Sequence, residues 1–159
     1  MALWRAQGRP FSTEMPSPAV FGKLTARPSP EKIVSSAWIR TRLEDPKVHL
    51  LDARPPDSYS GANPGEFTRA GHTPGARDVP LMTALQPDGT LKAAEALREI
   101  MSPGGGQEPA TSVSYCNTGQ QATLLYLVGR DLGVDVRLYD GSMQDWTRQP
   151  DLPVESSPK

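Results

Sequence analysis

The sequence has a single cysteine, no long apolar run and almost no net charge. One cysteine among 159 residues cannot form an intramolecular disulfide or a Cys-x-x-Cys zinc knuckle, which is typical of a reducing compartment. No apolar stretch reaches the roughly 18 residues that a membrane-spanning helix needs. The chain has 17 Lys and Arg against 18 Asp and Glu, interspersed along its length. This balance argues against a nucleic-acid partner and against an anionic membrane surface.

Histidine is also scarce, and the N-terminus lacks the apolar core of a signal peptide. His49 falls in an expected strand and His72 in an expected turn, so the two do not make a metal-binding pair. We therefore expect no metal and no cofactor. We expect a cytoplasmic protein, because prolines disfavour the amphipathic helix of a transit peptide. The mitochondrial matrix is the alternative, since Arg5 and Arg9 stand among few acids.

Strand-like and helix-like stretches alternate between segments rich in proline and glycine. We expect helices over 31–46, 91–102 and 121–133, strands over 47–54, 76–81, 111–116 and 135–140, and a linker at PGGGQEP (103–109). The alternation predicts one α/β domain, with a mostly parallel central sheet covered by helices on both faces. Trp38, Leu127 and Trp146 stand in periodic apolar settings, and we expect them in the core together with the methionines.

Cys116 lies where an expected strand ends and an expected helix begins. In parallel sheets, ligands bind beyond the carboxyl ends of the strands. The turn CNTGQQA (116–122) must be tight, and Gly119 permits backbone angles that other residues resist. Successive N–H groups turned inward, followed by a helix N-terminus, would cradle an anion such as a thiolate or a persulfide. The alternative is that Cys116 is only a small buried apolar residue.

Four motifs, in their order and spacing, resemble the rhodanese-type sulfurtransferase family. They are LLDARPPDSYSG (50–61), RAGHTPGARDVPL (69–81), SYCNTGQQA (114–122) and VRLYDGSMQDW (136–146). The leader WRAQGRPFSTEMPSP (4–18) and the segment YDGSMQDWTRQPDLPVE (139–155) further resemble parts of tandem-domain thiosulfate/3-mercaptopyruvate sulfurtransferases, namely the interdomain linker and the catalytic C-terminal domain.

This resemblance implies a domain organisation. Residues 1–21 would be the remnant of a preceding domain with its linker, 22–155 the rhodanese domain, and 156–159 a C-terminal tail. The segments 3–14 and 145–156 share a tryptophan, a polar spacer and a proline, which fits two such units.

The resemblance implies that Cys116 is the catalytic nucleophile. It would take the outer sulfur of a small anionic donor as a persulfide and pass that sulfur to cyanide or a thiol. The implied cradle is the loop backbone, formed by Asn117, Thr118, Gly119, Gln120, Gln121 and Ala122. The related phosphatases have a loop one residue longer that ends in a phosphate-binding Arg. Ala122 at that place argues against phosphatase activity.

The resemblance leaves the donor open between thiosulfate and 3-mercaptopyruvate. Asn117 and Thr118 replace the basic residues of thiosulfate-preferring relatives, and Thr118 keeps the hydroxyl of the mercaptopyruvate-preferring ones. Ser58 stands where both groups carry a substrate-binding Arg. Arg69 either supplies a substitute charge or is an ordinary surface residue before a turn.

Arg69 and three other residues are expected to support the loop from a second layer. Asp52 and Arg54, at the end of a strand, would either form an ion pair that orients the loops or act directly in catalysis, and we place both in the second layer. His72 would shape the turn GHTPGA (71–76) together with its proline and glycine.

Two functions stay open on the sequence alone. The first is a sulfurtransferase, and the second is a sulfur-carrier or regulatory module that binds a partner and turns over little. Cys116 favours the enzyme, whereas Ser58 and the absence of a first domain favour the module. Apolar surface that a first domain would cover is left exposed in this resemblance. We therefore expect a homodimer, or pairing with a separate first-domain chain.

Overall fold

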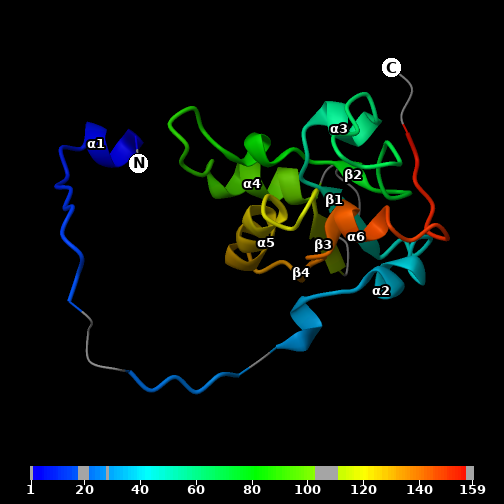
Figure 1. Cartoon of the computed structure of the whole chain (residues 1–159), viewed down its shortest axis with the longest axis horizontal. Coiled ribbons are helices and arrows are strands. Elements are labelled where there is room, and N and C mark those ends of the chain that lie inside the picture. Colours follow the sequence, from blue (N-terminus) through cyan, green and yellow to red (C-terminus); the bar gives the residue numbers. More distant parts are fainter. Residues whose placement is uncertain (1, 18–21, 28, 103–110, 157–159) are drawn as a thin grey trace.

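Four parallel strands form the central sheet, in the order β2-β1-β3-β4 (Figure 1). The computed structural model describes residues 2–17, 22–27, 29–102 and 111–156. The strands are β1 (Val48–Asp52), β2 (Arg77–Asp78), β3 (Thr111–Tyr115) and β4 (Val136–Leu138). The pairing of β1 with β3 sets Asp52 opposite Tyr115. The α/β fold with a parallel sheet, expected from the alternating pattern, is confirmed.

Helices cover both faces of this sheet. On one face, α4 (Ala94–Met101) and α5 (Ala122–Asp131) pack against Leu51 of β1. On the other face, α2 (Ser36–Arg40) and α6 (Ser142–Trp146) pack against Leu50 and Val113. Neighbouring strand residues thus enter different clusters, as the two-residue period of a strand requires. The remaining elements are α1 (Ala2–Ala6), η1 (Pro30–Lys32), α3 (Pro56–Ser60) and η2 (Leu81–Ala84).

The helix expected over 31–46 is wrong in most of its length. Val34 N–H donates to Leu138 O at 2.9 Å, so this stretch runs along the edge strand β4 before α2 begins. The short α2 starts only after Ser35, whose hydroxyl accepts Trp38 N–H. The strand expected over 76–81 is limited to β2. The expected linker 103–109 lies outside the described residues.

The core assignments from the sequence are partly confirmed. Trp146 is fully buried and Trp38 packs partly buried against the same cluster. Leu127 is 57% exposed, so its assignment to the core is wrong. Helix α5 turns Leu125 and Val128 toward the sheet, and Leu127 stands on a different side of the helix. Of the methionines, Met101 and Met143 are buried, but Met15 and Met82 are exposed.

The N-terminal segment repeats a contact made at the other end of the chain. Figure 1 shows residues 2–17 and 22–27 (blue) running away from the sheet, and the described side chains among them are exposed. Trp4 Nε1 donates to Pro10 O at 3.0 Å, and Trp146 Nε1 donates to Pro153 O at 2.7 Å. The two segments that share a sequence pattern therefore share a tryptophan-to-proline hydrogen bond. In the described part of the chain, no helix is long and apolar enough to cross a membrane.

Candidate active site

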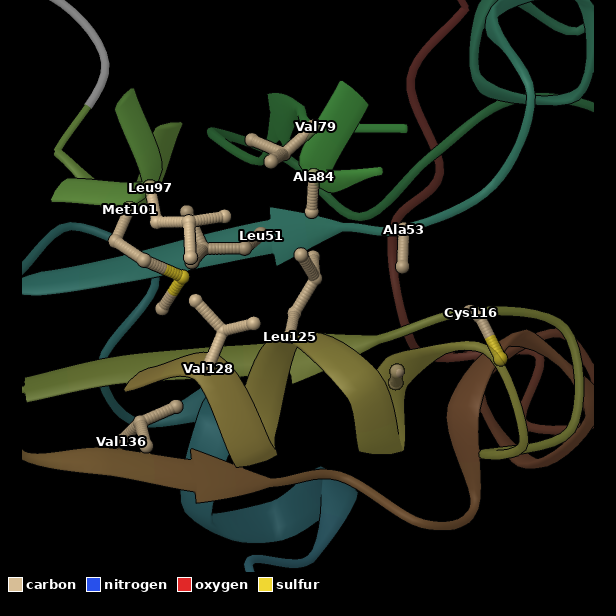
Figure 2. Close-up of a cluster of buried hydrophobic side chains, with 11 residues drawn as sticks. Leu51, Ala53, Val79, Ala84, Leu97, Met101, Cys116, Leu125, Val128 and Val136 are labelled. Atoms are coloured by element: carbon tan, nitrogen blue, oxygen red, sulfur yellow. The ribbon is translucent and has the colours of Figure 1, made fainter. Parts of the chain in front are cut away.

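Cys116 ends β3 and begins the loop that leads into α5. Its side chain is only 1% exposed, and Figure 2 shows it at one end of a buried cluster, beside this loop. Within the described residues, no backbone N–H of 117–121 donates to a protein acceptor. These amides, next to the N-terminus of α5, are available to a bound anion.

The start of α6 orients the loop backbone. The N–H groups of Met143 and Gln144 donate to Cys116 O and Asn117 O, each at 3.0 Å. In a trans peptide the carbonyl and the following N–H point in opposite directions. Because these two carbonyls point at α6, the next two amides point away from it. The contact therefore keeps these N–H groups free of α6.

Gly119 makes the tight turn of the loop possible. Its φ is +87°, and a Cβ at this position would lie 2.6 Å from Asp140 Oδ1 and 2.9 Å from Asp140 O. Glycine adopts positive φ without the penalty that a side chain brings. The loop backbone therefore packs directly on the turn between β4 and α6, with no room for a methyl group.

Gly119→Ala should lower the free energy of unfolding by more than about 2 kcal/mol, because strain at positive φ adds to the overlap with Asp140. Gly133→Ala is the matched control, since Gly133 has φ +76° and nothing within 4 Å of its Cβ position. Urea denaturation measures both variants. Equal losses of stability would show that the contact with Asp140 does not constrain the loop.

Ser142 fastens Cys116 to the turn after β4. Its Oγ accepts Cys116 N–H at 3.0 Å and donates to Tyr139 O at 2.9 Å. Ser142 is fully buried and, among the described residues, is the one non-glycine with positive φ, at 52°. Such strain persists where the surroundings hold it, often at functional sites. The sequence reasoning missed this residue, and the available signal was the Gly-Ser pair directly after an expected strand.

Ser142→Ala should lower the free energy of unfolding by about 1–3 kcal/mol, because the buried Cys116 N–H loses its acceptor. Ser112→Ala is the control, since the buried Ser112 hydroxyl has no hydrogen-bond partner in the described part of the protein. That change should be neutral or stabilising. Thermal and chemical denaturation of both variants give the comparison, and a neutral Ser142→Ala would remove Ser142 from this role.

Asp52 and Arg54 form a buried ion pair at the end of β1. Arg54 Nη2 lies 2.7 Å from Asp52 Oδ2, and Arg54 also donates from Nη2 to Gly71 O at 2.8 Å. Burial alone would lower the pKa of Arg54, but the hydrogen bond and charge of Asp52 outweigh it and raise that pKa. A negative charge on Cys116 would also raise the pKa of Arg54, so the ion pair lies within electrostatic reach of the thiol.

Tyr115 links this pair to the turn after residue 71. Burial raises the pKa of Tyr115 well above its ordinary value, and the Asp52 carboxylate adds to the effect. The phenol therefore stays protonated, and its oxygen accepts Thr73 N–H at 3.2 Å.

His72 lies in the same turn and is 5% exposed. Its ring stacks on Tyr59 at 3.8 Å between centroids, and Nδ1–H donates to Tyr59 O at 2.8 Å. Its backbone pairs in both directions with Glu155. These contacts fit the turn-shaping role expected from the sequence. No three His, Cys, Asp or Glu side chains of the described residues gather closely enough to hold a metal ion.

Arg69 fastens the segment before this turn to the end of α6. Its guanidinium donates to four backbone carbonyls at 2.5–3.3 Å, those of Trp146, Thr147, Gln149 and Leu152. All of these lie at least 77 residues further along the chain. The side chain is partly buried, and its donors are used by these carbonyls. Arg69 therefore sets the position of the preceding residues 65–68.

A cavity of about 540 Å³ opens beside the cysteine loop. Its described walls are residues 65–68, residues 117–118, and the side of α6 with its following turn. Arg69 holds the first wall against the end of α6, while the amides at the start of α6 hold the loop. Glu66 and Arg148 are the two charged side chains among the described lining residues, and Ser58 does not line the cavity.

A sequence profile described as the rhodanese-like domain matches residues 35–149. The chain belongs to this family. The profile covers β1 to β4 and the cysteine loop, so the motifs that resemble the family lie within one rhodanese-like domain. The expectation drawn from those motifs is confirmed at the level of the family.

The rhodanese-like domain is similar to several curated proteins. It is 32% identical to the sulfur carrier protein TtuD of Thermus thermophilus over 95% of this chain. It is 30% identical to a thiosulfate sulfurtransferase of Azotobacter vinelandii over 98% of this chain. It is 28% identical to the mitochondrial thiosulfate/3-mercaptopyruvate sulfurtransferase 1 of Arabidopsis thaliana over 96% of this chain. The chain spans 57%, 57% and 46% of these relatives, about half of their length.

Solved structures show the same fold. The anaerobic ergothioneine biosynthesis enzyme from Chlorobium limicola, in complex with trimethyl histidine, matches with a TM-score of 0.83 at 22% identity. That match covers 98% of this rhodanese-like chain and 40% of the other. A persulfide form of EanB with ergothioneine matches with a TM-score of 0.85 at 21% identity, over 98% and 40% of the two chains.

Proposed function

We propose that this chain catalyses sulfur transfer from a small anionic donor to cyanide or a thiol, through a persulfide on Cys116. One observation carries the proposal. The chain's only cysteine is buried at the carboxyl end of β3, in a loop whose amides 117–121 have no acceptor among the described residues. A thiolate with fixed N–H dipoles around it suits covalent catalysis that forms an anionic intermediate.

The first half-reaction transfers one neutral sulfur atom to the thiolate. With thiosulfate, Cys116 Sγ attacks the outer sulfur, an S–S bond forms on the protein, and the S–S bond of thiosulfate breaks to release sulfite. With 3-mercaptopyruvate, the C–S bond breaks and the electron pair leaves as the pyruvate enolate, which takes up the thiol proton. In both cases the negative charge of the thiolate reappears on the persulfide.

The second half-reaction restores the thiolate. The acceptor, cyanide or a thiolate, attacks the outer persulfide sulfur, and the protein S–S bond breaks. Cyanide leaves as thiocyanate, and no oxidant or reductant is needed. Residues 117–121 would stabilise the persulfide anion with backbone N–H groups alone. Arg54 donates its hydrogen bonds to Asp52 and to Gly71 O rather than to the loop. Ala122 carries no charge that could bind a phosphate.

The test is steady-state turnover. Reduced protein is mixed with cyanide and either thiosulfate or 3-mercaptopyruvate, and thiocyanate is measured against time. We expect many molecules of thiocyanate per chain with at least one donor. A yield that stops at one thiocyanate per chain would overturn catalysis and support a carrier.

The second candidate is a sulfur carrier that hands its persulfide to a protein partner. The similarity to the sulfur carrier protein TtuD, at 32% identity, favours it. The chain also spans about half of its relatives' length, and in this second candidate it pairs with a second rhodanese-like domain, in a separate chain or as a homodimer. Size-exclusion chromatography with light scattering distinguishes a dimer from a monomer.

A further inference from the structure

The cavity beside the cysteine loop has a charge pattern that bears on the choice of donor. Its described lining residues carry one cation, Arg148, and one anion, Glu66. The other side chains on its walls are hydroxyls, amides and one phenylalanine. The formal charge of these walls is therefore zero, which does not suit a dianion.

Arg148 is available to a ligand. Its side chain is exposed and makes no hydrogen bond or ion pair among the described residues. The adjacent Thr147 is fixed by two hydrogen bonds, from its amide and its hydroxyl to Met143 O. The backbone that carries Arg148 is thus held at the end of α6. A planar guanidinium in this position can bind a carboxylate through two parallel N–H donors.

Asn117 adds a second preference to the same cavity. Its side-chain oxygen is buried and has no hydrogen-bond partner in the described structure, although the residue lines the cavity. A buried acceptor without a donor costs free energy that a ligand with a hydrogen to donate removes. A mercaptocarboxylate brings a thiol S–H as well as a single carboxylate. Thiosulfate at neutral pH brings two negative charges and only acceptors.

We propose that Arg148 and Glu66 select the charge of the sulfur donor. Arg148 binds the single carboxylate of a mercaptocarboxylate, and Glu66 disfavours dianions such as thiosulfate. This inference rests on the proposed function, because it assigns the donor of the same site. Arg148 and Glu66 determine specificity, while the bond changes take place at Cys116.

The kinetic test compares two donors on wild type, two cavity variants and two control variants. Wild type, Arg148→Gln and Glu66→Gln are assayed with 3-mercaptopyruvate and with thiosulfate, with Arg40→Gln and Glu95→Gln as exposed controls outside the cavity. Arg148→Gln should raise KM for 3-mercaptopyruvate by about 10-fold to 100-fold with little change in kcat, since it removes a charge-assisted contact. Glu66→Gln should lower KM for thiosulfate by about fivefold. The controls should match wild type.

A binding measurement separates this inference from the proposed function. Pyruvate and sulfate are titrated into Cys116→Ser by calorimetry, with and without Arg148→Gln. Pyruvate should bind more tightly than sulfate, and Arg148→Gln should abolish that preference. If wild type turns over neither donor but this binding pattern holds, the proposed function fails and the charge selection stands.

Two outcomes overturn the inference while leaving the proposed function intact. One is an Arg148→Gln enzyme whose KM for 3-mercaptopyruvate changes by less than about twofold. The other is a wild type that prefers thiosulfate, with Glu66→Gln leaving that preference unchanged.

Discussion

Cys116→Ser abolishes sulfur transfer in our account, with a loss of at least about 10³-fold in the rate of thiocyanate formation. A serine hydroxyl is close in size to the thiol, but its oxygen does not accept and return a sulfur atom. Because Cys116 is the chain's only cysteine, no second thiol can substitute. The measurement is steady-state turnover with cyanide and the donor that wild type prefers.

The same variant should keep its fold. The hydrogen bonds that anchor residue 116 use its backbone N–H and carbonyl, which the substitution leaves in place. Its free energy of unfolding should therefore stay within about 1 kcal/mol of wild type. An unfolded Cys116→Ser protein would make its inactivity uninformative. A folded Cys116→Ser protein with more than about 1% of wild-type turnover would contradict the assignment of the nucleophile.

Arg54→Met should be among the most destabilising single changes, with a loss of about 3–5 kcal/mol in the free energy of unfolding. It removes the partner of the fully buried Asp52 carboxylate and the donor to Gly71 O. An unpaired charge at this depth is not compensated by solvent. Urea denaturation at neutral pH measures the effect.

A double-mutant cycle with Asp52→Asn tests whether the pair is the cause. The double variant should lose much less stability than the sum of the two single losses, because no buried charge is left unpaired. Asp135→Asn is the control, since Asp135 pairs with Arg137 at 3.7 Å in a more exposed place and should cost less than about 1 kcal/mol. Additive losses at Asp52 and Arg54 would contradict this interpretation of the pair.

The sheet and the helix after Cys116 could be predicted because local pattern and tertiary structure agree there. Strand β1 and helix α5 lie within the ranges that their apolar runs predicted. The helix expected over 31–46 failed for a long-range reason. Val34 and Trp38 stand four residues apart, as on one face of a helix, and both pack on the same cluster, but Val34 pairs with Leu138, far along the chain. Edge pairing with the sheet overrides a local helical pattern.

The candidate site follows the same rule. The turn at Gly119 and the ion pair of Asp52 with Arg54 are local features, and the structure places them as the sequence predicted. Ser142 and Arg69 act on partners 26 and 77 or more residues away. Neither the apolar periodicity nor the motifs indicate that these side chains contact such distant partners. The cavity beside the loop depends on long-range contacts of this kind, from Arg69 and from the amides at the start of α6, so the sequence did not predict it.

The central claim is that Cys116 carries the transferred sulfur, and intact-protein mass spectrometry tests it most directly. Reduced wild type and Cys116→Ser are incubated with 3-mercaptopyruvate or thiosulfate, desalted, weighed, and weighed again after cyanide. The account predicts one added sulfur atom on wild type, none on Cys116→Ser, and its removal by cyanide. Equal sulfur on both proteins, or turnover by a wild type that never gains sulfur, would contradict it.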